Sequence, residues 1–136
     1  MSHTLRRIVT GHNDTGQSII EIDGGPATQL SANGSGLHEI WLTETIPADN
    51  ATLVDKIKET DPTLCPPSGA VKVRWFTVPV ENPDASAADK EAAAALGFAA
   101  VAASHCRVDT SLHPAMHKTA SVDYIILISG EVDLLL

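Results

Sequence analysis

Cysteine, aromatic residues and basic residues are all scarce in this sequence of 136 residues. The two cysteines, Cys65 and Cys106, are far apart and form no close pair of the kind that binds a metal, so we expect reduced thiols. The first residues lack the apolar stretch and the small-residue cleavage site of a signal peptide. Together these absences predict a cytoplasmic protein.

Long apolar runs and an excess of positive charge are also missing. No run approaches the ~20 apolar residues that a membrane-spanning helix needs. Nine Lys and Arg against seventeen Asp and Glu give a net charge of −8 with neutral histidines. Such an acidic surface repels phosphate groups, so we expect no nucleic-acid partner and no binding to anionic membranes.

Two common enzyme motifs are absent as well. No Gly-rich loop joins a strand to a helix, so the sequence gives no support to a P-loop or a dinucleotide-binding fold. No Ser or Cys lies in the setting of a nucleophile elbow. The hydrophobic fraction of 43% and the chain length instead favour one folded domain that buries its own core.

Short β-branched stretches dominate the first half of the chain. Residues 5–10 and 18–22 flank a segment rich in Gly, Asn and Asp, which predicts an opening hairpin. Residues 24–36 are typical of a loop by composition. Residues 37–43 predict a third strand. Residues 70–80 give the clearest strand pattern, because apolar and basic side chains alternate along them.

Two segments have helical patterns. Residues 49–59 carry apolar side chains at helical spacing behind an Asp-Asn pair that can cap a helix. Residues 90–96 are good helix formers that follow a capping-box sequence beginning at Ser86. Gly97 comes directly after them, and we expect the helix to end there.

The remaining segments, 98–108, 116–129 and 132–136, have strand-like patterns, with a bend expected at Gly130. The last of these is apolar and has nothing after it to pair with or cover it, which makes an exposed edge prone to aggregation. Either a partner subunit covers it or the sequence is the front part of a longer chain. We favour the second interpretation.

The most informative side chains lie in the segment 113–131. His117, Thr119 and Asp123 share one parity, so an extended chain projects them from the same face as Ile125 and Leu127. An imidazole, a hydroxyl and a carboxylate would then face one cavity with an aliphatic wall. Such a cavity can hold a small polar ligand, move a proton or contribute to a metal site.

This segment resembles the first motif of the cupin superfamily, in a subgroup where the motif is degenerate. That motif has an initial glycine, two histidines, a glutamate and a closing glycine. His117 falls on the first histidine and Gly130 on the closing glycine. Thr119 replaces the second histidine, Asp123 replaces the glutamate and Ser111 replaces the initial glycine. The resemblance is sharp from residue 112 onward and loose before it.

The resemblance implies a mainly β fold, a cupin-like double-stranded β-helix or jelly-roll barrel with one or two short helices. Residues 1–136 would form a single such domain, incomplete at its C-terminus because the second cupin motif does not follow residues 111–130. It also implies a homodimer and a ligand cavity. A cupin metal is held by three histidines and a glutamate, and His117 is the one histidine retained. We therefore expect either no cofactor or a divalent metal bound through His117.

The function implied is small-molecule binding, with acid–base catalysis of the dehydratase, isomerase or decarboxylase type. The substrate would be a small organic acid, carbonyl compound or polyketide-like metabolite. His117 would move the proton, Asp123 would orient it and Thr119 would hold a substrate oxygen. A cupin that binds a metabolite without catalysis and a metal-dependent dioxygenase are the alternatives.

Each candidate residue also has a structural interpretation. His117 can line a barrel without a catalytic role, and Asp123 can anchor a turn through its carboxylate. Trp41 and Trp75 can be walls of the cavity that stack on the ligand, but large aromatic side chains more often belong to the core.

Overall fold

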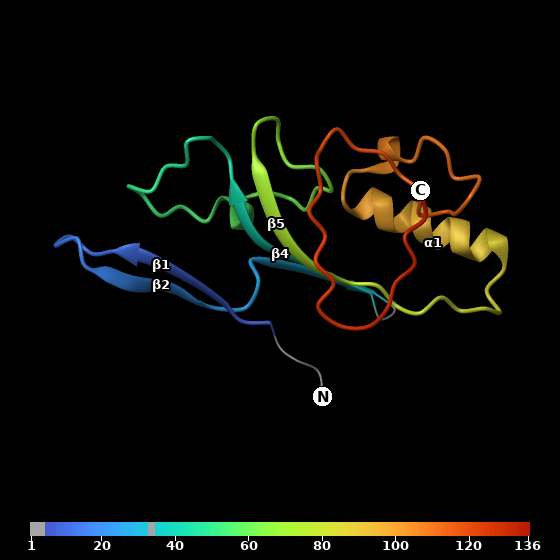
Figure 1. The fold of residues 1–136 in the computed structure, drawn as a ribbon, viewed down its shortest axis with the longest axis horizontal. Helices are drawn as coiled ribbons and strands as arrows, with labels where there is room; N and C mark the ends of the chain where they lie inside the picture. Colours follow the sequence, from blue (N-terminus) through green and yellow to red (C-terminus); the bar gives the residue numbers. More distant parts are fainter. Residues whose placement is uncertain (1–4, 33–34) are drawn as a thin grey trace. The chain divides into compact units, whose positions relative to one another are not determined.

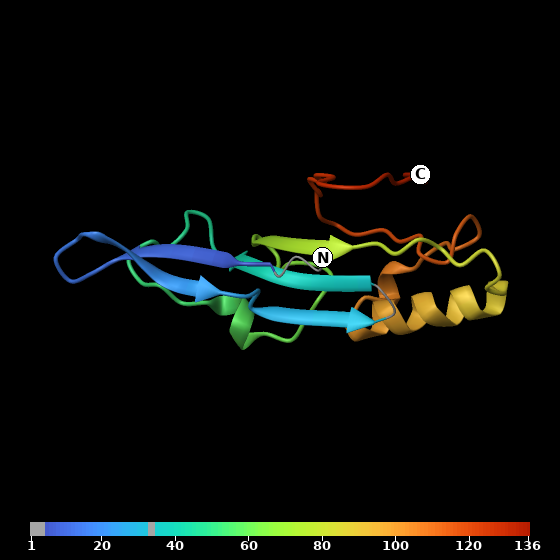
Figure 2. The ribbon, with the colours of Figure 1, turned by 90° about the horizontal axis from the view of Figure 1, so that it is seen from below.

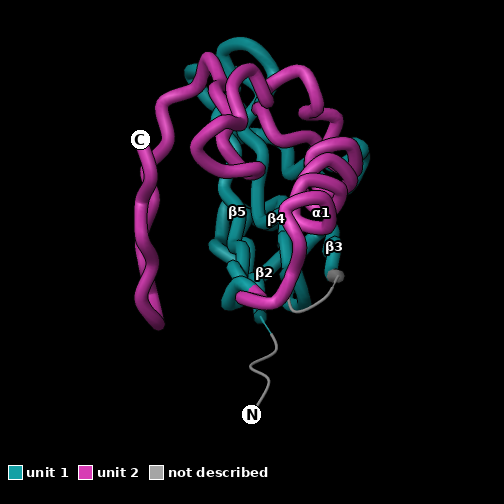
Figure 3. Tube along the Cα trace, turned by 90° about the vertical axis from the view of Figure 1, so that its right-hand side faces the viewer, with its two compact units in different colours: residues 1–62, 66–81 teal, residues 63–65, 82–136 magenta. Residues whose placement is uncertain are grey.

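The computed structural model describes residues 5–32 and 35–136. In these residues the chain is mainly β, with five strands in two antiparallel sheets and one α-helix (Figure 1). The chain divides into two units, which Figure 3 draws in different colours. The sheet unit comprises residues 1–62 and 66–81, and the helix unit comprises residues 63–65 and 82–136.

The sheet unit opens with the hairpin predicted from the sequence. Strand β1 (Arg7–His12) pairs antiparallel with β2 (Ser18–Gly24). In the turn between them, the side-chain oxygen of Asn13 accepts a hydrogen bond from the backbone N–H of Gln17 at 2.9 Å. Gly16 has a φ of +77°, a left-handed conformation that glycine adopts without steric cost. The turn residues therefore fix this hairpin locally, and the prediction is confirmed.

The second sheet has the order β3-β4-β5 (Figure 2). Its strands are β3 (Thr28–Ala32), β4 (Ser35–Thr43) and β5 (Val71–Thr77), so the two strands predicted in this region are confirmed. The loop predicted over residues 24–36 is wrong, because β3 pairs with the first half of β4. Pairing supplies backbone hydrogen bonds that composition does not register. Residues 33–34 of that range lie outside the described chain.

The alternation along β5 is confirmed, but the face that it buries is the charged one. Glu39 on β4 is 1% exposed, and its Oε1 accepts a hydrogen bond from Nη2 of Arg74 at 2.9 Å. Nζ of Lys72 lies 3.7 Å from the same oxygen. Val73 and Trp75 project from the opposite face and are exposed. Buried charges persist when they are paired, as these three are.

The helix predicted over residues 49–59 is wrong, since only the 3-10 helix η1 (Lys56–Glu59) forms there. Asp49 initiates a turn instead. Its carboxylate accepts hydrogen bonds from the backbone N–H of Ala51 and from the hydroxyl of Thr52, both at 2.8 Å. A side chain that caps a helix can equally close a local turn, and β-branched neighbours disfavour the helical alternative.

The helix unit contains α1 (Ala87–Ala100), whose start was predicted correctly. Ser86 is its N-cap, and the Ser86 hydroxyl accepts a hydrogen bond from the N–H of Asp89 at 3.1 Å. The expected end at Gly97 is wrong, because the helix continues through this glycine. The chain reverses instead at Ala102, which has a φ of +52°.

The strand expected over residues 98–108 is also wrong. Its first residues complete α1, and a 3-10 helix, η2 (Ser104–Cys106), follows. Residues 116–129 and 132–136 join no sheet in the described chain. The bend between them is confirmed at Gly130, whose φ is +87°. A strand requires a partner for its backbone groups, and an apolar alternation alone does not supply one.

The mainly β class is thus confirmed at the level of strands and sheets. Neither sheet closes into a barrel within the described residues, so the jelly roll remains a prediction. Over the same residues, no helix has the length and apolar character that crossing a membrane would require.

Candidate functional site

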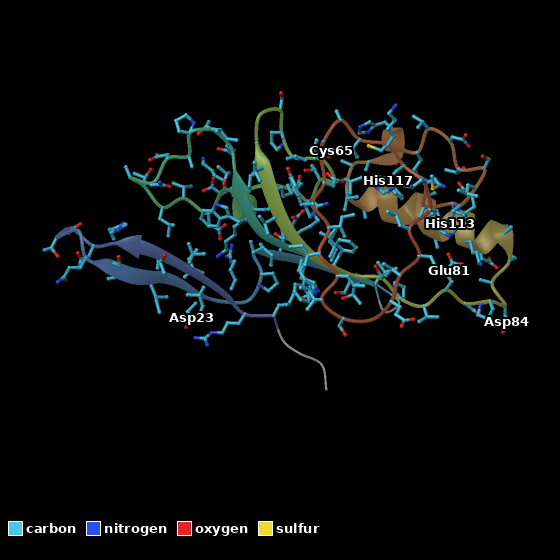
Figure 4. The ribbon with its side chains drawn as sticks, viewed as in Figure 1. Asp23, Cys65, Glu81, Asp84, His113 and His117 are labelled. Carbon is cyan, nitrogen blue, oxygen red and sulfur yellow. The ribbon has the colours of Figure 1, made fainter. Side chains whose placement is uncertain are left out.

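His117 lies on an irregular segment of the helix unit, against α1 (Figure 4). Its imidazole contacts the ring of Phe98, with centroids 5.0 Å apart and planes tilted by 60°. The guanidinium carbon of Arg107 lies 5.8 Å from the centre of the same phenyl ring. The phenyl ring therefore supports the imidazole from one side, while His117 itself stays exposed to solvent.

The backbone is anchored on both sides of His117. The guanidinium of Arg107 donates to the carbonyl oxygen of Pro114 from Nε at 3.1 Å and from Nη2 at 2.9 Å. Nη2 also binds a carboxylate of α1 at 2.6 Å. Past the histidine, the N–H of Lys118 donates to the carbonyl oxygen of Cys106 at 2.9 Å. These bonds restrict the positions that the imidazole can adopt.

The hydrogen bonding of His117 selects one tautomer. Nδ1 lies 2.9 Å from the carbonyl oxygen of Ala115, and a carbonyl oxygen can only accept. In the neutral ring the proton must then be on Nδ1, which leaves the lone pair of Nε2 unprotonated. Among the described residues Nε2 has no hydrogen-bond partner. The ring thus presents a base, or a single metal ligand, to the solvent.

Thr119, Ser121 and Asp123 form a hydrogen-bonded row next to the histidine in sequence. Oγ1 of Thr119 lies 2.9 Å from Oγ of Ser121, which donates to Oδ1 of Asp123 at 2.8 Å. The single hydroxyl proton of Ser121 is used on the carboxylate, so Thr119 must donate to Ser121. The oxygen of Thr119 therefore has free lone pairs and can accept a hydrogen bond from a ligand.

The three predicted polar residues are thus only partly brought together. Thr119 and Asp123 are linked through Ser121, as their common parity predicts for an extended chain. The imidazole of His117 is oriented by the carbonyl group of Ala115, whereas the orienting role had been expected of Asp123. The catalytic roles of these side chains remain predictions.

Trp41 lines a groove of about 740 Å³ in the sheet unit. The groove is bounded by β1, by the second half of β4 and by the segment that follows it. Glu44 and Lys56 both line it and approach each other to 3.9 Å. Asp49 is another lining residue, and hydrogen bonds from the Thr52 hydroxyl and from backbone N–H groups lower the pKa of its carboxyl. Trp41 is half-buried, and its role as a wall that stacks on a ligand remains a prediction.

The other residues expected to form the cavity wall are more exposed to solvent. Trp75 lies on β5 opposite His38 of β4 and is partly exposed. Ile125 and Leu127 lie on the unpaired segment of the helix unit and are largely exposed. Because this segment joins no sheet in the described chain, the role of these two residues as a cavity wall remains a prediction.

The donor set at His117 does not match the metal centre of a cupin. Among the described residues no group of three or more His, Cys, Asp or Glu side chains is placed to hold a metal ion. The hydroxyls of Thr119 and Ser121, which follow His117 in the sequence, are weak ligands for the metals that imidazole prefers. Binding of a divalent metal through His117 therefore remains a prediction.

Comparisons with known proteins leave the family open. No family model matches the chain, and no curated protein matches it significantly. What the structure itself defines is a mainly β chain that carries an exposed imidazole of fixed tautomer, followed in sequence by a hydroxyl–carboxylate row.

Three contributors to this site were not identified from the sequence. Ser121 could have been identified from the sequence, because it shares the parity of Thr119 and Asp123. No sequence pattern indicated Phe98 or Arg107, since their contacts with the 114–117 segment depend on the path of the chain after α1.

Proposed function

We propose that this chain is a cupin-like domain that binds a small organic molecule at His117 and performs acid–base chemistry on it. The observation that carries the proposal is the fixed tautomer of His117, with Nε2 free to accept a proton. A positioned imidazole base of this kind accelerates proton transfer by typically about 10²–10⁴-fold. The resemblance of residues 111–130 to the first cupin motif supports the same assignment.

The hydrogen bonds of His117, Thr119 and Asp123 support the roles that we propose for them. Nε2 of His117 takes a proton from a carbon or hydroxyl group of the substrate and later returns it. Thr119 accepts a hydrogen bond from a hydroxyl group of the substrate, and Asp123 holds the row in place through Ser121. Dehydration, isomerisation and decarboxylation of a small organic acid, carbonyl compound or polyketide-like metabolite all require such a proton transfer.

Proton abstraction can be tested before the natural substrate is known. Candidate organic acids and carbonyl compounds are incubated with the protein in D₂O, and exchange of their C–H protons is followed by NMR. His117→Asn keeps an amide donor for the carbonyl group of Ala115 but removes the base, so we expect exchange to fall by about 10²-fold or more. His113→Asn is the matched control, and it should exchange like the natural sequence. Equal exchange in both variants would overturn the assignment.

A binding protein without catalysis is the second candidate, and the exposure of His117 favours it. Enclosed sites strengthen electrostatic catalysis, and an imidazole open to water gains less from its surroundings. In this case the same compounds would shift the His117 ring resonances without any exchange of C–H protons. The NMR experiment therefore separates the two candidates.

We further propose that the chain works as a homodimer whose second copy covers exposed apolar strands, as in a jelly roll. The exposed side chains of β5 and the unpaired apolar segment after residue 122 support this proposal. A cytoplasmic location is proposed on the same footing, from the scarcity of cysteine.

A further inference from the structure

The helix unit contains both cysteines of the chain, although 40 residues separate them in sequence. The segment that carries Cys65 is joined to the turn after α1, because the N–H of Leu64 donates to the carbonyl oxygen of Val101 at 2.8 Å. Cys106 ends the 3-10 helix η2 a few residues later. Figure 4 labels Cys65, which lies near the turn after α1. Both cysteines are free thiols in the structure.

The surroundings of the two thiols differ. Cys65 is half-buried, whereas Cys106 is 3% exposed. Burial raises the pKa of the Cys106 thiol, and the adjacent Cys65 thiol raises it further. The imidazole Nε2 of His105 lies 3.5 Å from Sγ of Cys106. One thiol is thus accessible to a solute, and the other is protected but has a base beside it.

We propose that Cys65 and Cys106 form a redox-active pair, a modification site at which a peroxide produces an intramolecular disulfide. This site is separate from the proposed function of His117 and does not depend on it. The accessible Cys65 reacts first, and the buried Cys106 completes the bond. The fold supplies the proximity, which neither the spacing nor the number of cysteines in the sequence indicates.

The reaction balances in two steps. The Cys65 thiolate attacks one oxygen of the peroxide, the O–O bond breaks, and a sulfenic acid and hydroxide form. Sγ of Cys106 then attacks the sulfur of Cys65, the S–O bond breaks and a second hydroxide leaves. The proton of the Cys106 thiol passes through His105 to this hydroxide, giving water. Both thiols are oxidised, and the peroxide is reduced to water.

Ring closure in the folded and unfolded chain tests the geometry. Reduced protein is treated with hydrogen peroxide in native buffer and in concentrated urea, and the linked peptides are quantified by mass spectrometry. We expect the disulfide between Cys65 and Cys106 to form at least about tenfold faster in native buffer, because the fold holds the two sulfurs together. Equal rates in the two buffers, or disulfides between different chains, would overturn the proposal.

Single substitutions test the order of the steps. In Cys106→Ser the sulfenic acid on Cys65 should persist and be trapped by dimedone, whereas in Cys65→Ser the remaining thiol should react slowly. Cys106→Ala provides a second variant if serine destabilises the buried position, and circular dichroism checks both folds. His105→Asn should slow ring closure several-fold and change its pH dependence without altering the first step. Rapid trapping in Cys65→Ser would contradict the assigned order.

Discussion

At the scale of single residues, two Arg–Asp pairs in the sheet unit share a forked geometry but differ in burial. Arg6 and Asp23 are joined by two hydrogen bonds of 2.6 Å on the surface. Arg7 and Asp55 are joined by bonds of 3.1 and 2.7 Å, with side chains only 7% and 13% exposed. Water solvates the ions of the exposed pair whether or not they are paired. In the buried pair, each ion depends on the other for compensation of its charge.

This difference predicts opposite outcomes for equivalent substitutions. Asp55→Ala leaves the buried guanidinium of Arg7 without its carboxylate, which should lower the free energy of unfolding by about 3–5 kcal/mol. Asp23→Ala is the matched control and should hardly move the midpoint of urea unfolding. The double change Arg7→Met with Asp55→Leu should recover much of the loss, because no unpaired charge remains. Similar midpoints for the two alanine variants would contradict this explanation.

A second prediction at this scale concerns pH. The hydroxyl of Thr52, followed by the N–H of Ala51, lowers the pKa of Asp49 below its ordinary value of 3.8. The ionised carboxyl is thus favoured in the folded state. Its contribution to stability is present above the unfolded pKa and is lost as the pH falls through the folded pKa. In a carbon-13 NMR titration, Thr52→Val should raise the pKa of Asp49 back toward 3.8, whereas Thr60→Val should leave it unchanged.

At the scale of elements, a helix or strand could be predicted from the sequence when the interactions that fix it lie within a few residues of one another. The β1–β2 turn and the start of α1 were predictable because Asn13, Gly16 and Ser86 make hydrogen bonds or adopt dihedral angles within a few residues. The strand β3 was missed because its stability comes from pairing with β4, not from its own composition. In the candidate site, parity correctly grouped Thr119 with Asp123, but the contact with Phe98 required the tertiary fold.

The end of α1 shows how one residue type can mislead. Gly97 indicated a C-terminus, yet the left-handed position is occupied by Ala102. The N–H of Ala103 donates to the carbonyl oxygen of Phe98 at 2.8 Å, and that of Ala102 donates to Ala99 at 3.1 Å. This is a Schellman motif in which alanine takes the place usually held by glycine.

Placing a glycine at position 102 tests whether Ala102 is strained. Ala102→Gly removes the Cβ that disfavours positive φ, so the free energy of unfolding should rise by about 0.5–1 kcal/mol. Ala93→Gly, on an exposed position inside α1, should lower it by a similar ~1 kcal/mol. Thermal unfolding of both variants measures the two effects. A loss of stability in both would show that Ala102 is not strained in solution.

At the scale of the whole molecule, the distribution of apolar surface is unusual for a single chain. Residues along β5 and in the segment 122–136 expose large aliphatic side chains, whereas the buried face of β5 carries Lys72 and Arg74. Exposed apolar side chains that gather within one unit mark an interaction site or an aggregation hazard. The proposed homodimer would cover such strands by a second copy of the chain.

Association between copies should therefore depend on the exposed face of β5. Val73 is 50% exposed at the centre of this strand, and Val73→Lys places a charge there that a dimer interface would have to desolvate. We expect the dissociation constant measured by sedimentation to rise about tenfold or more, since burial of a valine contributes ~1.5 kcal/mol or more. Val80→Lys, at a position 97% exposed and outside the strand, is the control and should associate normally. If both variants associate like the natural sequence, the face of β5 takes no part in dimerisation.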